Sequence, residues 1–157
     1  MTEQQKERKQ STQATGDITY HHSMPIQLRF TDADRFGHVS NSVYLQYYDT
    51  AKVDYFSKVG AAIFDYSRTL IVAHIEYNFI SQVFTTDDVA VESAITHIGH
   101  KSVRLSQRLV DRRTGEVKCE GHSVMVCYDM ERKETVPVWP QWIEAINAFE
   151  GRDLRQQ

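Results

Sequence analysis

Residues 29–48 read Arg-Phe-Thr-Asp-Ala-Asp-Arg-Phe-Gly-His-Val-Ser-Asn-Ser-Val-Tyr-Leu-Gln-Tyr-Tyr, and this stretch is the most informative part of the chain. A strand-like run ends in two acids, crosses a Gly-His loop and continues into an apolar, tyrosine-rich helix. Asp34, Gly37, His38 and Asn41 therefore fall together at one strand-to-helix junction. Backbone amides at the start of a helix favour negative charge. An acid beside such amides is the minimum equipment for acyl transfer.

The helix after this junction is predicted to run from about residue 41 to about residue 59. Ser40 and Asn41 are residue types that cap helices with their side chains, and Gly60 is a typical C-terminal stop. Apolar residues recur along the helix at three- and four-residue spacing. They are Val43, Tyr44, Tyr47, Tyr48, Ala51, Tyr55 and Phe56. Because this stripe is rich in aromatic residues, the helix is predicted to be buried.

The rest of the chain consists mainly of predicted strands. Alternating or β-branched runs indicate strands at 25–30, 70–79, 89–97, 103–111 and 116–128. A short amphipathic helix is expected from Trp139 or Gln141 to Phe149, and residues 111–115 form a hairpin turn. A curved antiparallel sheet can cover one long apolar helix. The sequence therefore predicts an α+β fold, with such a sheet wrapped around one central α-helix.

Composition limits the class of partner. The 157 residues are 41% apolar with a formal net charge of −3, which predicts one soluble domain that does not bind nucleic acid. No apolar run reaches the roughly 18 residues that cross a bilayer, so no membrane partner is expected. Cys119 and Cys127 would lie ~26 Å apart on one regular strand, too far for a disulfide. Free thiols indicate a reducing compartment, and the cytoplasm is the expected location.

The domain is expected to occupy residues 19–150. Residues 1–17 hold almost no apolar side chains that could offset the entropy of ordering, so residues 1–18 are predicted to be a disordered tail. Residues 151–157 are expected to form a C-terminal tail.

One segment resembles a known family. Asp34-Arg-Phe-Gly-His-Val-Ser-Asn-Ser-Val-Tyr44 is similar to the D-x-x-G-H-V-(N/S)-N-x-x-Y segment of hotdog-fold acyl-CoA thioesterases, the 4-hydroxybenzoyl-CoA thioesterase-like group. The likeness extends from about residue 24 to residue 129 through the order and spacing of elements, and it is weaker outside 32–44. It implies a hotdog fold and hydrolysis of an acyl thioester of CoA or of an acyl-carrier protein, without a cofactor.

The resemblance assigns roles to individual residues. Asp34 falls on the acid that acts as general base or nucleophile in this group, while Asp32 is assigned to organising the loop. His38 falls on the histidine of the pattern, where it could polarise the carbonyl or position water. The amides of Gly37 and Val39 are the candidate oxyanion donors. Ser40 departs from the commoner asparagine, which removes one side-chain amide from the comparison.

Each of these residues also has a purely structural interpretation. Asp34 could be a loop carboxylate that caps its own backbone. His38 could pin the loop to the opposite strand. Asn41 could cap the helix, contact Asp34 or orient water. Tyr44 fits a core or dimer contact as well as the wall of an acyl pocket.

CoA brings three phosphate groups, so exposed cations are expected at the rim of the site. The best candidates by position follow a glycine turn and are His100, Lys101, Ser102 and Arg104. Two further basic pairs are Arg112-Arg113 and Arg132-Lys133. No metal is expected, because no Cys or acid stands at ligand spacing beside the two histidines of residues 97–100.

Rival functions remain open at this level. The same fold could bind an acyl thioester without turnover and act as a sensor. Hotdog dehydratases usually carry a His-Phe-Pro-Gly type loop, and that tetrapeptide is absent here. A single protomer would expose a sheet edge and much of the cleft, so a homodimer or homotetramer is expected, with two sites at the interface.

Overall fold

The computed structural model describes residues 18–60, 65 and 67–155. Apart from residue 18, the predicted N-terminal tail lies outside these described residues. Within them the chain forms, in order, β1 (His22–Ile26), the 3-10 turn η2 (Phe30–Asp32), α2 (Asn41–Val59), β2 (Arg68–Phe79), β3 (Val89–Ile98), β4 (Ser102–Asp111), β5 (Val117–Asp129), β6 (Glu134–Thr135) and α3 (Pro140–Glu150).

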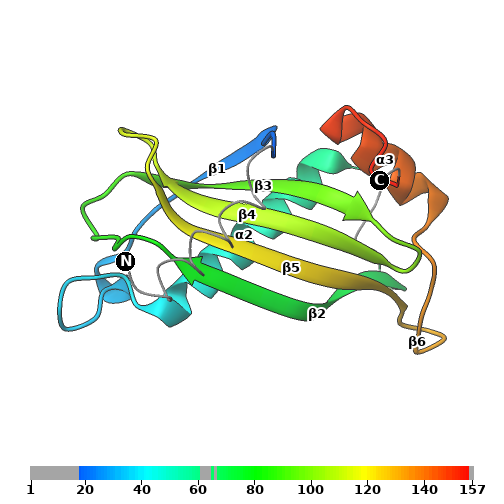
Figure 1. Cartoon of the computed structure of the whole chain (residues 1–157). Helices are drawn as coiled ribbons and strands as arrows, with labels where there is room; N and C mark the ends of the chain where they lie inside the picture. Colours follow the sequence, from blue (N-terminus) through cyan, green and yellow to red (C-terminus); the bar gives the residue numbers. More distant parts are fainter. Residues whose placement is uncertain (1–17, 61–64, 66, 156–157) are drawn as a thin grey trace, which may run out of the picture.

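The strands form one curved antiparallel sheet in the order β1-β3-β4-β5-β2, with β6 paired to β5. Helix α2 lies along one face of this sheet, and α3 lies at one end of it (Figure 1). The loop before α2 lies at the opposite end, next to the end of β2 (Figure 1). This is the predicted α+β hotdog fold.

Helix α2 begins and ends where the sequence predicts. The buried part of its stripe is Tyr44, Tyr47, Tyr48, Ala51, Tyr55 and Phe56. Gly60 stops the helix with a φ of 80°, which glycine adopts at no steric cost. The prediction of a side-chain cap is wrong. Ser40 is the N-cap residue but makes no side-chain hydrogen bond to the helix, and Asn41 is already the first helical residue.

Strand β1 differs most from its prediction. It spans His22–Ile26 instead of 25–30, and Phe30 is 92% exposed. The chain leaves the sheet because Asp32 accepts hydrogen bonds from the backbone N–H and the Nε of Arg29, which closes the turn η2. The short strand β6 was not predicted either.

The interior consists of two apolar clusters. One holds the first half of α2, and the other holds its second half together with α3. A polar contact lies within the second: the Tyr55 hydroxyl donates to Glu150 (2.6 Å), which also accepts the N–H of Ile95 (3.1 Å). Burial raises the pKa of Glu150 above its ordinary value, although both hydrogen bonds oppose the rise.

The predicted C-terminal tail is shorter than expected. Leu154 is only 2% exposed, and its N–H donates to the side chain of Asn147 (3.0 Å). Its carbonyl accepts the N–H of Ile98 (3.0 Å). The packed domain therefore extends past residue 150. Within the described residues, no helix is both long and apolar enough to cross a bilayer.

Candidate functional site

The loop before α2 is a tight turn that holds the Asp34 carboxylate. The N–H of Asp34 donates to the carbonyl of His38 (2.7 Å), and Gly37 takes a φ of 80° at the turn. One carboxylate oxygen, Oδ1, accepts the N–H groups of Phe36 (2.8 Å) and His38 (3.2 Å). Asp34 thus caps its own loop, as the structural interpretation supposed. Its other oxygen has no hydrogen-bond partner among the described residues, so this bonding leaves it available for chemistry.

Asp32 has a different environment from Asp34. It is buried and accepts hydrogen bonds from Arg29 and from the Tyr47 hydroxyl. Burial opposes ionisation, but the Tyr47 and Arg29 hydrogen bonds and the Arg29 charge outweigh it and lower the pKa of Asp32 below its ordinary value. The carboxylate of Asp32 therefore holds the loop and helix together, and all its described contacts are structural.

A cavity of about 200 Å³ opens beside this loop. Five of the predicted site residues line it: Asp34, His38, Val39, Asn41 and Tyr44. The opposite wall is the last residue of β2, Phe79, and the segment that follows it, made by Ile80, Ser81, Gln82 and Val83. No sequence pattern singled out this second wall, because it reaches the site only through sheet pairing. The two walls are joined where the N–H of Val39 donates to the carbonyl of Val83 (2.8 Å).

The two predicted oxyanion donors are already engaged in this conformation. The N–H of Gly37 donates to the carbonyl of Asp34 (3.1 Å), and that of Val39 donates to Val83. Each amide would have to give up its bond to a backbone carbonyl before it could bind a substrate oxygen. The N–H groups of Asn41 and Ser42, in the first turn of α2, have no partner among the described residues. The first turn of a helix always leaves such donors.

The aromatic residues divide between structure and cavity. The His38 ring packs edge-to-face on Phe84 with centroids 4.9 Å apart, which pins the loop to the chain opposite. Tyr47 and Tyr48 lie in the core, as most helical tyrosines were expected to do. Tyr44 is buried but also lines the cavity. Burial raises the pKa of Tyr44 to about 12, so its hydroxyl stays protonated.

The predicted phosphate patch lies at the other end of the sheet. Ser102 on β4 pairs with Val126 of β5, whereas Phe79 of the cavity pairs with Cys119 of β5. Seven residues separate these two positions on β5, or roughly 23 Å along a strand. The turn between β3 and β4 and the loop before α2 lie at opposite ends in Figure 1. One chain therefore does not bring His100 and Lys101 to the Asp34 cavity.

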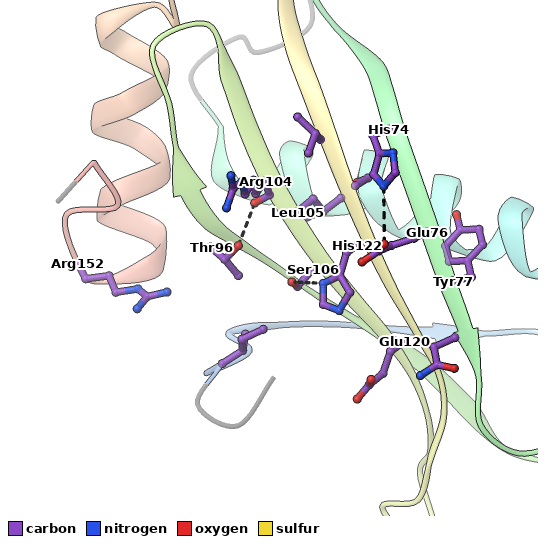
Figure 2. Close-up of a pocket in the computed structure, with 14 residues that line it drawn as sticks. His74, Glu76, Tyr77, Thr96, Arg104, Leu105, Ser106, Glu120, His122 and Arg152 are labelled. Atoms are coloured by element: carbon purple, nitrogen blue, oxygen red, sulfur yellow. Dashed lines mark hydrogen bonds and ion pairs between the residues drawn. The ribbon is translucent and has the colours of Figure 1, made fainter. Parts of the chain in front are cut away.

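A larger cavity of about 700 Å³, the outer basin, lies on the sheet face turned away from α2 (Figure 2). Its acidic, basic and histidine side chains are His74, Glu76, Arg104, Glu120, His122 and Arg152, and Tyr77 also lines it. The Ser106 hydroxyl bonds to Nδ1 of His122 (2.9 Å), and Ser106 is only 3% exposed. Arg104, one of the predicted phosphate ligands, belongs to this basin. No cluster of metal-ligating groups occurs in the part of the chain that the structure describes.

The part of the chain that forms the Asp34 cavity matches a family model. Residues 28–146, which include both walls of the cavity, match the model of the thioesterase-like superfamily. The chain belongs to this family. As a member of it, the chain is an enzyme that hydrolyses thioesters.

Solved structures and a curated protein are also similar to the chain. A thioesterase from Thermus thermophilus, solved with coenzyme A and zinc, is 27% identical with a TM-score of 0.74, and the match covers 85% of this chain and 96% of that one. The DHNA-CoA thioesterase of Staphylococcus aureus is 19% identical with a TM-score of 0.70 over 82% of this chain and 90% of that one, a likeness that shows the fold alone. The uncharacterized protein YsmA of Bacillus subtilis (strain 168) is 24% identical over 111 residues, which are 71% of this chain and 75% of YsmA.

Proposed function

We propose that this thioesterase hydrolyses acyl-CoA at the cavity that holds Asp34. One observation carries the proposal: a loop-held carboxylate with one unbonded oxygen lines the same cavity as the first turn of a long helix. Membership of the thioesterase-like superfamily supports the reaction. The Thermus relative with bound coenzyme A supports CoA as the thiol.

Asp34 acts in one of two ways. As a general base, it takes a proton from a water molecule that attacks the carbonyl carbon of the thioester. As a nucleophile, its unbonded oxygen attacks that carbon, the thiolate leaves, and water hydrolyses the resulting anhydride. Both routes release a carboxylic acid and the CoA thiol, and neither needs a metal or redox cofactor.

The first turn of α2 stabilises the oxyanion in this proposal. The N–H groups of Asn41 and Ser42 replace those of Gly37 and Val39 as donors, because they have no other partner among the described residues. The first turn of α2 contains no acidic residue, so nothing within the helix offsets the positive end of its dipole. The side chain of Asn41 lines the cavity and orients the attacking water.

Two arginines at the same end of the sheet are better placed for the CoA phosphates than the β3–β4 turn. The N–H of Arg112 donates to the carbonyl of Asp88 (2.8 Å), and the Arg113 guanidinium donates to that of Thr86 (3.2 Å). Both carbonyls belong to the segment that continues from the second wall of the cavity. Arginine is suited to bidentate phosphate binding.

A second copy of the chain completes the site in this proposal. Strand β2 is at the edge of the sheet, and its 12 residues pair only with β5 among the described strands. Ile71, Ile75 and Phe79 are exposed apolar residues on this edge, and such edges readily pair with another chain. Antiparallel pairing of two β2 strands would bring the second copy's β3–β4 end towards the Asp34 cavity. Sedimentation velocity should show a dimer, and a monomer at all concentrations would exclude this arrangement.

Thiol release from a panel of acyl-CoAs and acyl-carrier-protein thioesters tests the function. The wild type should release free thiol from at least one acyl-CoA, and Asp34→Ala should not. Asp49→Ala is a matched control, because Asp49 is a carboxylate of α2 paired with Lys52 outside the cavity. A folded wild type that binds acyl-CoA in calorimetry without hydrolysis would identify a binding module instead. Hydrolysis of carrier-protein thioesters alone would show that the substrate is an acyl-carrier-protein thioester and not acyl-CoA.

A further inference from the structure

Two aromatic contacts bridge α2 and the edge strand β2 next to the Asp34 cavity. In the first, Tyr44 of α2 meets Phe79 of β2 edge-to-face, with ring centroids 5.1 Å apart. In the second, Tyr48 of α2 stacks on Tyr77 of β2 at 5.0 Å with an interplanar angle of 14°. Residues four apart on a helix and two apart on a strand face the same way. The two contacts therefore lie one after the other between α2 and β2. We call Tyr44–Phe79 the first rung and Tyr48–Tyr77 the second rung.

The second rung depends on a residue without a side chain. Gly121 pairs with Tyr77 in the sheet, and a Cβ at position 121 would lie 2.7 and 2.8 Å from two carbons of the Tyr77 ring. It would also lie 3.7 Å from the Tyr48 ring. Gly121 thus leaves the space that the stacked pair occupies.

Only the first rung lines the cavity. Both Tyr44 and Phe79 are among its lining residues, whereas Tyr48 and Tyr77 are not. The centroid of the Tyr77 ring lies 6.3 Å from that of the Phe79 ring. The cavity of about 200 Å³ is smaller than the roughly 300–1,000 Å³ usual for small-molecule pockets. The space for an acyl group is therefore short, and two layers of aromatic rings stand behind it.

We propose that the Tyr44–Phe79 rung ends the acyl pocket and restricts this thioesterase to short or compact acyl groups, with the Tyr48–Tyr77 rung as the next stop. This inference rests on the proposed function, because it assigns the acyl group to the Asp34 cavity. Both rungs are built within one chain, from α2 and the edge strand β2. Phe79 is the specificity-determining residue, since it lines the cavity and lies on the edge strand β2.

Substitution of the rungs should lengthen the preferred acyl chain in two steps. Phe79→Ala should raise the ratio of kcat/KM for octanoyl-CoA over butyryl-CoA at least about tenfold, since one misplaced methylene is worth about 10–200-fold in a tight pocket. Phe79→Ala with Tyr77→Ala should extend the gain to dodecanoyl-CoA. Ile71→Ala is the matched control, because Ile71 is 41% exposed and Phe79 42% exposed on the same strand. The control should keep the wild-type chain-length profile.

Two further results decide the inference. Gly121→Ala crowds the Tyr77 ring without changing the residues that line the cavity. Added to Phe79→Ala, it should therefore change kcat/KM for dodecanoyl-CoA and leave kcat/KM for the shorter acyl-CoAs unchanged. A wild type that already hydrolyses dodecanoyl-CoA as fast as butyryl-CoA overturns the inference while leaving thioesterase activity intact. So does a Phe79→Ala protein with an unchanged profile. A wild type that hydrolyses no acyl-CoA overturns the proposed function and this inference with it.

Discussion

The Asp34 cavity and the outer basin lie on opposite faces of one sheet and differ in almost every property. The basin is the larger cavity, about 700 Å³ against 200 Å³. Six acidic, basic or histidine side chains line it. The Asp34 cavity has one acid, one histidine and a second wall that mixes apolar residues with Ser81 and Gln82. Yet only the smaller cavity combines a carboxylate with helix amides that lack a partner among the described residues.

Under the proposed function, a dense set of ionisable groups is a poor guide to the catalytic site. Ser106 and His122 are hydrogen-bonded to each other in the basin, but the serine is only 3% exposed. Asp34 is bonded through one oxygen only, as far as the described residues go, and the cavity has both polar donors and an apolar surface. Differential stabilisation of a transition state needs those features together.

The strongest test of this contrast substitutes one residue from each cavity. Asp34→Asn should lower kcat/KM for the best acyl-CoA by about 10²–10⁴-fold, the range for loss of a general base. The asparagine oxygen can still accept the Phe36 and His38 N–H groups, so the loop should persist. Ser106→Ala should keep kcat/KM within about twofold of the wild type, because Ser106 lines the basin and not the Asp34 cavity. Equal losses in both variants would contradict the assignment.

A second prediction concerns the loop beneath the cavity. Asp32→Ala should lower the free energy of unfolding by about 2–3 kcal/mol, because it leaves the buried Tyr47 hydroxyl without its acceptor and removes the charge partner of Arg29. Urea unfolding measures this loss. Arg29→Ala is the comparison, and its loss should be smaller because that side chain is mostly exposed.

The pH dependence of this effect has a defined sign. The folded-state pKa of Asp32 is lowered from 3.8, so its stabilisation is fully present above that ordinary value. The difference between wild type and Asp32→Ala should shrink as pH falls below 3.8 through the lowered pKa. A difference that stays constant down to about pH 2 would show that the charge of Asp32 contributes nothing.

A third and smaller effect is expected at the far end of α2, outside both cavities. The folded-state pKa of Glu150 is raised from 4.5, so its charged form destabilises the protein as pH rises through the raised value. Glu150→Gln keeps an acceptor for Tyr55 and Ile95 but carries no charge. Its stability relative to wild type should improve by about 1 kcal/mol as pH rises through that range, since one pKa unit is worth about 1.4 kcal/mol. Paired urea titrations at several pH values from 4.5 up to about 8 check this.

The smallest effect on activity is predicted for substitutions in the basin. Ser106→Ala should cost about 1 kcal/mol of stability, the usual value of one hydrogen bond, while acyl-chain preference stays unchanged. His122→Ala should behave alike. A change in chain-length profile in either variant would connect the basin to the site and remove the contrast between the two cavities.

The local elements of this protein could be predicted from the sequence. Helix α2 was bounded correctly, because three- and four-residue periodicity and the stop at Gly60 are local signals. The four long strands were also placed within two residues of their observed bounds. Strand β1 was misplaced, since the bonds between Asp32 and Arg29 that end the sheet there depend on side chains rather than on hydrophobic alternation.

Only one wall of the candidate site could be predicted from the sequence. Asp34, His38 and Asn41 lie close together in the chain, so the motif alone is enough to group them. The second wall at residues 79–83, the engagement of the Gly37 and Val39 amides, and the distance to His100 were decided only by tertiary structure. Strand pairing joins residues that are far apart in the chain, as Phe79 and Cys119 are, and the register of that pairing depends on the whole sheet. Local composition therefore determined which residues could act, and the register of the sheet decided which of them share a cavity.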